Sequence, residues 1–270
     1  MWRVIVLEHG PEKVLSLKGL TKWYGEKLVL DHIDLDVYAG QIIGYIGPNG
    51  AGKSTTVKMI LGLEASYTGD VEIFGRNIKE SGVEYKRRIG YVPESADIYD
   101  NLSAREYLTF TGELYGLEAD KADYKAKQLM RVFGLDDVYD SRISSYSKGM
   151  KQKVLLISSL LHDPDILFLD EPINGLDANS VMVFKEILAQ LSAQGKTIFY
   201  SSHIMEVVEK ISSRILLLND GKIVADGSFE QLRQKNKEGS LEEIFNQLTG
   251  FNEQQNLADD FVRIVQRDNV

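Results

Sequence analysis

The first strands predicted from the chain alternate between apolar and polar residues. In HIDLDVY, residues 32–38, apolar side chains at 33, 35 and 37 are separated by aspartates. This pattern is typical of an antiparallel strand with one buried and one solvated face. VEIF at 71–74 shows the same pattern. The N-terminal part of the chain is therefore predicted to form an antiparallel β lobe.

The later strands are apolar throughout. They are QIIGYIG at 41–47, ILFLD at 166–170 and TIFYSS at 197–202, and a helical pattern follows each of them. Strands that are buried on both faces are typical of a parallel sheet covered by helices. The predicted fold class is therefore α/β, with a mostly parallel sheet and flanking helices.

The region between Glu94 and Asp163 shows no strand of this kind and is predicted to be helical. Ser103 and Glu106 have the spacing of a capping box at the start of a helix. A second helical pattern, YKAKQLMRVFGL, ends at Gly134. A helical lobe of about residues 95–163 is thus expected as an insertion into the α/β core.

Residues 1–250 are predicted to form one cassette domain, and residues 251–270 an acidic helical tail. Near the end of the cassette, RILLLNDGKIVADGS has the pattern of a hairpin around an Asp-Gly turn. The tail carries an apolar stripe at helical spacing, expected to pack on the protein's own domain, with docking on another protein as the alternative. The stripe consists of Leu257, Phe261, Ile264 and Val265.

Composition limits the classes of function. A chain of 270 residues with 43% hydrophobic content can bury a full core. Its apolar runs are far shorter than the roughly 18–20 residues needed to cross a bilayer, and MWRVIVLEHG has too short an apolar core for a signal peptide. The lack of cysteine excludes disulfides and thiolate metal sites, and a net charge of −9 argues against nucleic acid as a partner. A soluble, cytoplasmic protein is expected.

GPNGAGKST, residues 47–55, matches the phosphate-loop pattern G-x-x-x-x-G-K-[ST] and lies between a buried strand and a helical segment. Its glycines allow backbone N–H groups to surround a phosphate, and the helix start adds partial positive charge. Lys53 can reach the β- and γ-phosphate oxygens, and Ser54 can supply a hydroxyl to Mg²⁺. The loop therefore predicts a site for ATP and Mg²⁺.

Two further segments carry polar residues to the ends of buried strands, where ligands bind in open α/β sheets. In ILFLDEP, Asp170 can hold Mg²⁺ through water, and Glu171 can polarise the water that attacks the γ-phosphorus. In SSH, His203 can donate a hydrogen bond to the γ-phosphate or orient this water. A histidine at a strand end is as often structural.

In this order, GPNGAGKST, YSKGMKQKV, ILFLDEP, NGLD and SSH resemble the motifs of the nucleotide-binding subunit of an ABC transporter, from about Val14 to Gly250. The resemblance implies an ABC ATPase fold with catalytic roles for Glu171, His203 and Glu94. It implies that the ATP-binding residues are Tyr24, Gly47, Pro48, Asn49, Gly50, Ala51, Gly52, Lys53, Ser54 and Thr55. It implies a Mg²⁺ site of Ser54, Asp170 and Glu94, and a D-loop that contains Asp177.

Tyr24 is implied to stack on adenine, although an aromatic residue at this position could instead belong to the core. The neighbouring Trp23 is a weaker candidate for the stacking residue.

YSKGM aligns with the family's signature motif, usually LSGGQ. The resemblance implies that Ser147, Lys148, Gly149 and Met150 act on ATP bound by the other subunit of a homodimer or heterodimer. The same segment also has the pattern of a helix cap, because capping and anion binding use the same free N–H groups.

Two departures from the family pattern affect the proposed site. Glu94 replaces a usual Gln, and Lys148 and Met150 replace a usual Gly and Gln; Lys148 is expected to point to solvent. Together with SLEEIFNQLTG, these variants resemble the branch of ATPases that serve ABC-2-type exporters.

The family resemblance implies an ATPase that drives transport, in the direction of export, through permease subunits on other chains. The protein is then expected at the inner face of the cell membrane, held there by the permease. The alternative is a soluble ABC ATPase that acts as an assembly or remodelling module. The resemblance also implies that the region from Glu94 to Leu108 contacts the permease, with apolar contacts from Ile98, Tyr99 and Leu102. The alternative is that these three residues fill the core of the helical lobe.

Overall fold

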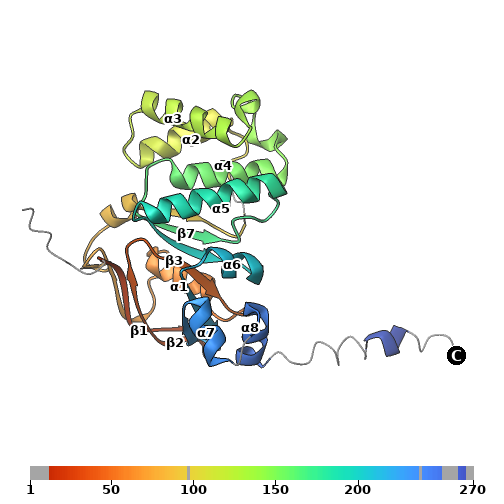
Figure 1. The fold of residues 1–270 in the computed structure, drawn as a ribbon. Coiled ribbons are helices and arrows are strands. Elements are labelled where there is room, and N and C mark those ends of the chain that lie inside the picture. The colour runs from red at the N-terminus through yellow and green to blue at the C-terminus, as the bar shows by residue number, and fades with distance from the viewer. Residues whose placement is uncertain (1–11, 96–97, 237–238, 251–260, 266–270) are drawn as a thin grey trace, which may run out of the picture.

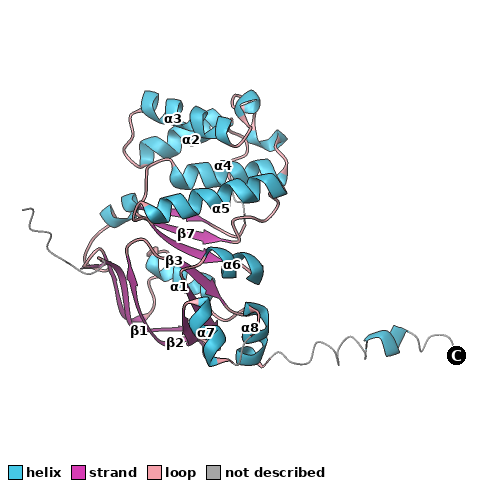
Figure 2. Cartoon of the chain, viewed as in Figure 1, coloured by secondary structure: helices cyan, strands magenta, loops and turns pink. Residues whose placement is uncertain are grey.

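The computed structural model describes residues 12–95, 98–236, 239–250 and 261–265. This part of the chain contains an antiparallel sheet, a mostly parallel sheet and a group of helices set above them in Figures 1 and 2. The strands are β1 Lys13–Tyr24, β2 Lys27–Tyr38, β3 Ile42–Ile46, β4 Thr68–Ile73, β5 Arg76–Asn77, β6 Ile89–Val92, β7 Ile166–Asp170, β8 Thr197–Ser201, β9 Arg214–Asn219 and β10 Lys222–Gly227. The α-helices are α1 Lys53–Ile60, α2 Ala104–Leu114, α3 Ala119–Val132, α4 Lys148–Leu160, α5 Ala178–Ala193, α6 Met205–Ile211, α7 Phe229–Lys235 and α8 Leu241–Thr249. The predicted α/β class is confirmed.

The N-terminal lobe is an antiparallel sheet with the strand order β2-β1-β4-β5. Leu17 of β1 lies opposite Leu35 of β2 on one side and Val71 of β4 on the other. This arrangement confirms the two strands predicted from alternation. β1 itself does not alternate, because its pairing with β2 shifts register several times and several consecutive residues are buried.

The larger sheet has the order β10-β9-β3-β8-β7-β6. All neighbours from β9 to β6 are parallel, and β10 forms the predicted antiparallel hairpin with β9. Every residue of β3, β7 and β8 is buried, as the continuous apolar runs predicted. β6 was not predicted; at four residues it is too short to show a period, and it joins the sheet by pairing with β7.

Two cores cover the two faces of this sheet. One packs the β lobe and α1 against it, so that Met59 of α1 shares a cluster with Val71 and Phe168. The other packs α5 to α8, with Phe184 and Ile244 among its buried side chains. Helix α1 is therefore held between the two sheets, which fixes the position of its first turn relative to the ends of β3 and β7.

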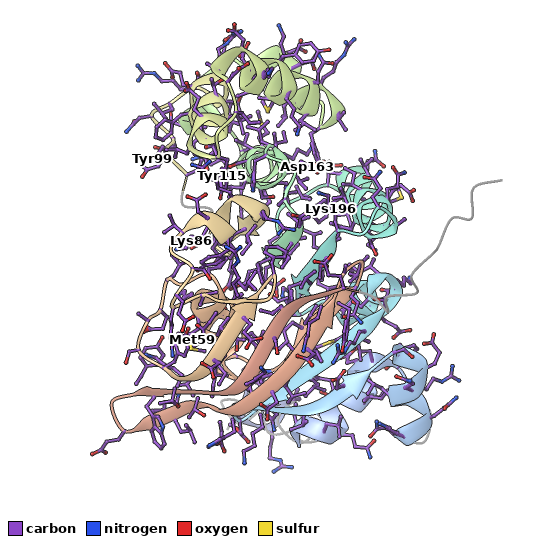
Figure 3. The ribbon with its side chains drawn as sticks, turned by 90° about the vertical axis from the view of Figure 1, so that its left-hand side faces the viewer. Met59, Lys86, Tyr99, Tyr115, Asp163 and Lys196 are labelled. Carbon is purple, nitrogen blue, oxygen red and sulfur yellow. The ribbon has the colours of Figure 1, made fainter. Side chains whose placement is uncertain are left out.

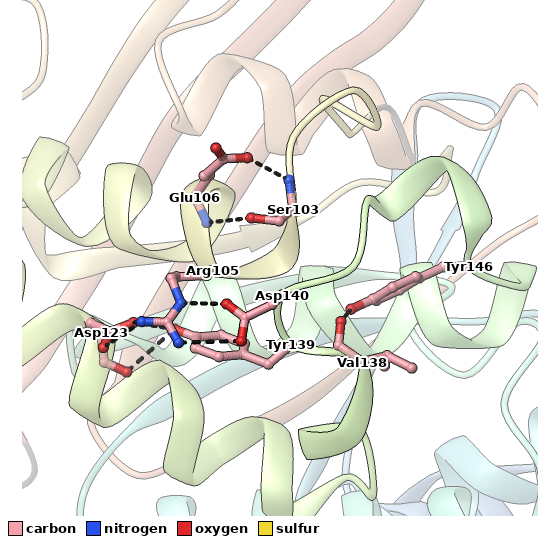
Figure 4. Close-up of polar contacts among 8 residues, drawn as sticks. All are labelled: Ser103, Arg105, Glu106, Asp123, Val138, Tyr139, Asp140 and Tyr146. Atoms are coloured by element: carbon pink, nitrogen blue, oxygen red, sulfur yellow. Dashed lines mark hydrogen bonds and ion pairs between the residues drawn. The ribbon is translucent and has the colours of Figure 1, made fainter.

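Helices α2, α3 and α4 enclose a third core and form the predicted helical lobe. Ser103 and Glu106 make the predicted capping box, in which each side chain binds the other's backbone N–H. Arg105 of α2 donates hydrogen bonds to Asp140 and to Asp123 of α3, which ties the lobe together (Figure 4). Helix α4 also packs against β6 and so joins the lobe to the core sheet.

Most of the predicted tail, including Leu257, lies outside the described residues. Residues 261–265 form a short helix away from the body of the chain in Figure 1. The stripe was expected to pack on the cassette. Its side chains at Phe261, Ile264 and Val265 are instead exposed. Within the described ranges, no helix has the length and apolar character needed to span a membrane.

Candidate active site

The phosphate loop connects β3 to α1 and follows the predicted strand–loop–helix order. Gly52 has a φ of 107°, in the left-handed region. A Cβ atom at this position would lie 2.5 Å from Cδ2 of Leu30, so only glycine fits without a shift. No side chain caps α1 at Gly52. The amides of its first turn are therefore available for an anion, with the helix dipole behind them.

Lys53 opens α1 and folds over the loop. Its Nζ donates hydrogen bonds to the carbonyl oxygens of Gly47 at 2.6 Å and Pro48 at 3.1 Å. Burial lowers the pKa of Lys53, and the nearby carboxylates, Asp170 first among them, oppose this shift by favouring the charged form. The ammonium group is thus held at the mouth of the loop, close to the amides that can surround a phosphate.

Asp170 ends β7 beside the phosphate loop, as predicted. Its Oδ2 accepts a hydrogen bond of 3.0 Å from the hydroxyl of Ser54, and its Oδ1 accepts one from the hydroxyl of Ser201. Two of the three residues predicted to hold Mg²⁺, Ser54 and Asp170, are therefore in direct contact. The third, Glu94, lines the same cleft as these two residues. Among the described residues, no group of three or more His, Cys, Asp or Glu side chains could hold a metal. This donor set fits a cation that takes its other ligands from phosphate and water.

Glu171 has a backbone φ of 49°, a left-handed conformation that costs a residue with a side chain about 1–3 kcal/mol. The carboxylate is nearly buried, and its Oε2 accepts a hydrogen bond of 3.0 Å from the hydroxyl of Ser202. Its Oε1 accepts one of 2.7 Å from the backbone N–H of His203, and the His203 Nδ1 lies 2.9 Å from the same oxygen. The carboxylate is therefore fixed in place at the carboxyl ends of β7 and β8.

These residues line one cleft of about 360 Å³. It is lined by Tyr24, Lys27, Val29, Asn49, Gly50, Gly52, Lys53, Ser54, Thr55, Glu94, Asp170 and Glu171. Tyr24 is 47% exposed, which excludes the alternative of a core tyrosine. Glu94 is also exposed.

The remaining predicted phosphate-loop residues do not line the cleft. Gly47 and Pro48 lie behind Lys53 and accept its hydrogen bonds, and Ala51 is buried in the core.

Several residues of the site were not predicted from the sequence. Ser201 and Ser202 bind the two carboxylates, and the hydroxyl residues that precede His203 in SSH were a signal for them. Lys27 and Val29 of β2 line the cleft because the turn after Tyr24 places β2 beside it. No pattern in the sequence indicated their role.

The signature residues are not among those that line this cleft. Ser147 caps α4, and its hydroxyl accepts a hydrogen bond from the N–H of Met150, which confirms the predicted cap. Lys148 is exposed, as expected, while Met150 packs against the core of the helical lobe. The start of α4 thus lies outside the cleft formed by the same chain.

Contacts inside the chain join α4 to the loop after β7. Gln152 donates a hydrogen bond of 3.0 Å to the carbonyl of Pro172, and Lys153 forms an ion pair of 3.2 Å with Asp177. Asp177 caps α5 by accepting hydrogen bonds from the hydroxyl and amide of Ser180, which with Lys153 hold its pKa well below the usual range. The signature helix and the segment after Glu171 are therefore one packed unit.

We expect Gly149→Ala to destabilise the protein by about 1–3 kcal/mol, the usual cost of an overpacked site. A Cβ atom at Gly149 would lie 2.3 Å from the carbonyl oxygen of Gly175, so α4 and this loop would have to move apart. Thermal unfolding measures the effect. Lys148→Ala is the matched control, because it changes the exposed neighbour and should leave the melting temperature nearly unchanged. Equal melting temperatures for the two variants would contradict the contact.

Known proteins resemble this chain in sequence over most of its length. The sequence model of the family described as ABC transporter matches residues 30–174. The chain is 36% identical over 214 residues to the ABC transporter ATP-binding protein NatA of Bacillus subtilis, which covers 79% of this chain and 87% of that protein. It is 35% identical over 225 residues to the bacitracin transport ATP-binding protein BcrA of Bacillus licheniformis, covering 83% of this chain and 72% of that protein.

Solved structures give the same result. A structure of the ATP-binding subunit of an ABC transporter matches with a TM-score of 0.82 and 32% identity, covering 87% of this chain and 99% of that one. A dimeric ATP-binding cassette in a post-hydrolysis state with ADP and Pi shares the fold, with a TM-score of 0.73 and 23% identity over 79% of this chain and 98% of that one. The chain therefore belongs to the ABC transporter family, as an ATP-binding ATPase subunit similar to those of the ABC-2-type exporter branch.

Proposed function

We propose that this chain hydrolyses ATP as one half of a dimer and drives export through membrane permease subunits on other chains. The observation that carries the proposal is the cleft in which an anion-binding helix start, Lys53 and the fixed carboxylate of Glu171 converge. The phosphates lie along the amides of the loop from Gly47 to Thr55, with Lys53 on the β- and γ-oxygens. The base stacks on Tyr24 at the other end of the cleft.

Ser54 and Asp170 are the residues that would hold Mg²⁺, and Glu94 lies at the same cleft to bind a water of its shell. When bound, the ion supplies charge neutralisation on the phosphate oxygens. Ser201 keeps the carboxylate of Asp170 oriented toward Ser54. Glu94 keeps a side-chain oxygen, as the more usual Gln has, but adds a negative charge. Its role in sensing the γ-phosphate therefore differs in detail from that of a Gln.

In the hydrolysis step, a water oxygen attacks the γ-phosphorus, and Glu171 accepts a proton from this water molecule. The bond between the water oxygen and phosphorus forms, and the bond from phosphorus to the bridging oxygen breaks with its electrons on ADP. Ser202 and His203 hold Glu171 for this step. The sequence predicts that His203 donates a hydrogen bond to the γ-phosphate or orients the attacking water. Its imidazole lies against the carboxylate of Glu171, so we assign it a role in orienting Glu171 as well.

A dimer accounts for the position of the signature residues. The start of α4 at Ser147 does not line its own chain's cleft, yet a helix start of this kind suits the negative charge of a γ-phosphate. A second chain related by two-fold symmetry supplies its signature to the first and receives one in return. ATP then closes the pair, and hydrolysis removes the group that both chains hold.

Export is the direction we propose because the chain is 34% identical over 218 residues to the Nod factor export ATP-binding protein I of Burkholderia lata. The permease would hold the protein at the inner face of the membrane. A soluble assembly module remains the competing function, and purification from detergent distinguishes the two. A polytopic membrane protein that copurifies supports transport, and a soluble partner alone contradicts it.

Tyr99→Lys should uncouple the permease while leaving the basal ATPase rate of the free subunit unchanged. Tyr99 is 71% exposed and lies where the helical lobe meets the rest of the chain in Figure 3. Ile98 and Leu102 are partly buried, so the alternative role in the core applies more to them. The substitution removes the apolar contact of the Tyr99 ring with the permease. Burying the lysine charge in that contact would also cost desolvation free energy. ATPase stimulation by the copurified permease measures the coupling.

Tyr124→Lys is the matched control, because Tyr124 is equally exposed on α3 of the same lobe. It should keep the stimulation. Loss of folding in Tyr99→Lys, seen as a lowered melting temperature, would instead place Tyr99 in the core of the lobe.

A further inference from the structure

Lys22 of β1 is a lysine buried beside the nucleotide cleft. Only 3% of its side chain is exposed, which is rare for a lysine unless its charge is paired. Its Nζ lies 3.0 Å from Oε1 of Glu64 and donates a hydrogen bond of 2.6 Å to the carbonyl oxygen of Ser66. It also lies 4.4 Å from the ring centroid of Tyr24. An anion, a carbonyl and a ring face therefore all act on this one ammonium group.

Glu64 makes the second connection to the same tyrosine. Its Oε2 accepts a hydrogen bond of 3.0 Å from the Tyr24 hydroxyl, and its Oε1 accepts one from the N–H of Ser66. Glu64 follows α1, and its own N–H bonds back to Lys58 of that helix. Because the other end of α1 carries the phosphate-binding turn, this network connects Tyr24 to the helix that carries that turn.

The ring of Tyr24 is thus held at two points. The cation of Lys22 lies against one face, and the carboxylate of Glu64 fixes the hydroxyl at the ring's edge. A ring that stands half exposed at the end of a strand would otherwise lose rotational freedom when a base stacks on it. Holding it in advance reduces this entropy cost of binding.

Building on the proposed function, we propose that Lys22 and Glu64 are positioning residues that hold the Tyr24 ring so that its remaining face accepts the base of the nucleotide. The pair acts on the stacked base and not on the phosphates, which the loop at Lys53 binds. Stacking accepts any base, since every base has a π face. The pair therefore strengthens nucleotide binding without choosing between adenine and guanine.

Calorimetry with two ligands tests this assignment. ATP has both a base and a triphosphate, whereas inorganic tripolyphosphate has only the phosphates. Lys22→Met should weaken ATP binding about tenfold, because stacking of the base on an aromatic side chain contributes to ATP binding. It should leave the Kd for tripolyphosphate unchanged. Glu64→Gln should weaken ATP less, because it keeps a partner for the Tyr24 hydroxyl. In steady-state assays KM for ATP should rise with kcat unchanged.

Two further variants sharpen the test. Lys79→Met is the matched control, since the Lys79 Nζ lies 4.4 Å from the ring centroid of Tyr67, away from the cleft; it should bind both ligands as the wild type does. In a Tyr24→Ala background, adding Lys22→Met should weaken ATP no further, because the ring it positions is gone.

The possible results separate the two proposals. If the wild type binds neither ligand, the proposed function fails. If the wild type binds both and Lys22→Met binds ATP equally well, or loses both ligands equally, the positioning role is wrong. An additive loss in the double variant also contradicts it.

Discussion

Glu171→Gln is expected to lower the rate of ATP hydrolysis by roughly two or more orders of magnitude, the range that general acid–base catalysis contributes, while ATP still binds. The amide keeps the size of the side chain and can still meet Ser202, so the fold around the loop is preserved. It cannot accept the proton of the attacking water. Single-turnover rates measure the chemical step, and calorimetry measures binding.

The same variant should accumulate as an ATP-bound dimer, because hydrolysis no longer removes the phosphate that both chains hold. Size-exclusion chromatography with and without ATP detects this. Glu206→Gln is the control, since Glu206 is exposed on α6 and pairs with Lys210; it should hydrolyse ATP normally and stay monomeric after turnover. If Glu171→Gln hydrolyses ATP at the wild-type rate, Glu171 is not the base.

The sequence predicted those parts of the fold whose pattern has a single explanation. β3, β7 and β8 are buried on both faces, and short continuous apolar runs that are each followed by a helical pattern are typical of a covered parallel sheet. β6 was missed because four residues show no period, and β1 because shifts in register bury neighbouring residues. In both cases the partner strand, and not the local pattern, determines the structure.

The residues of the site likewise divide into those that the sequence predicts and those that it does not. Lys53, Asp170 and Glu171 were predictable, because loop glycines and strand ends place a side chain whatever surrounds it. Lys22 was not, since a lysine on a strand is usually solvated, and its burial depends on Glu64 and Ser66, more than forty positions away. The attachment of α4 to the loop after β7 depends likewise on contacts between distant segments.

Mixing two inactive variants should restore part of the ATPase activity if two chains share each site. Lys53→Ala removes a charge-assisted contact to the phosphates, and should weaken ATP binding itself. Ser147→Arg places a bulky side chain at the exposed start of α4 and should abolish hydrolysis, yet leave ATP binding through Lys53 intact. Ser228→Arg is the control: it removes the cap of α7, away from the proposed seam, and should keep its activity.

A mixed dimer pairs the intact phosphate loop of the Ser147→Arg chain with the intact signature of the Lys53→Ala chain. With random pairing at equal amounts, half of the dimers are mixed and each has one complete site, so about a quarter of the wild-type sites return. Dimer formation with ATP is measured on the same mixture, since two sites that must act together would give mixed dimers without hydrolysis. If Ser147→Arg alone hydrolyses ATP at the wild-type rate as a monomer, the start of α4 is only a helix cap. The proposal that two chains share each site is then wrong.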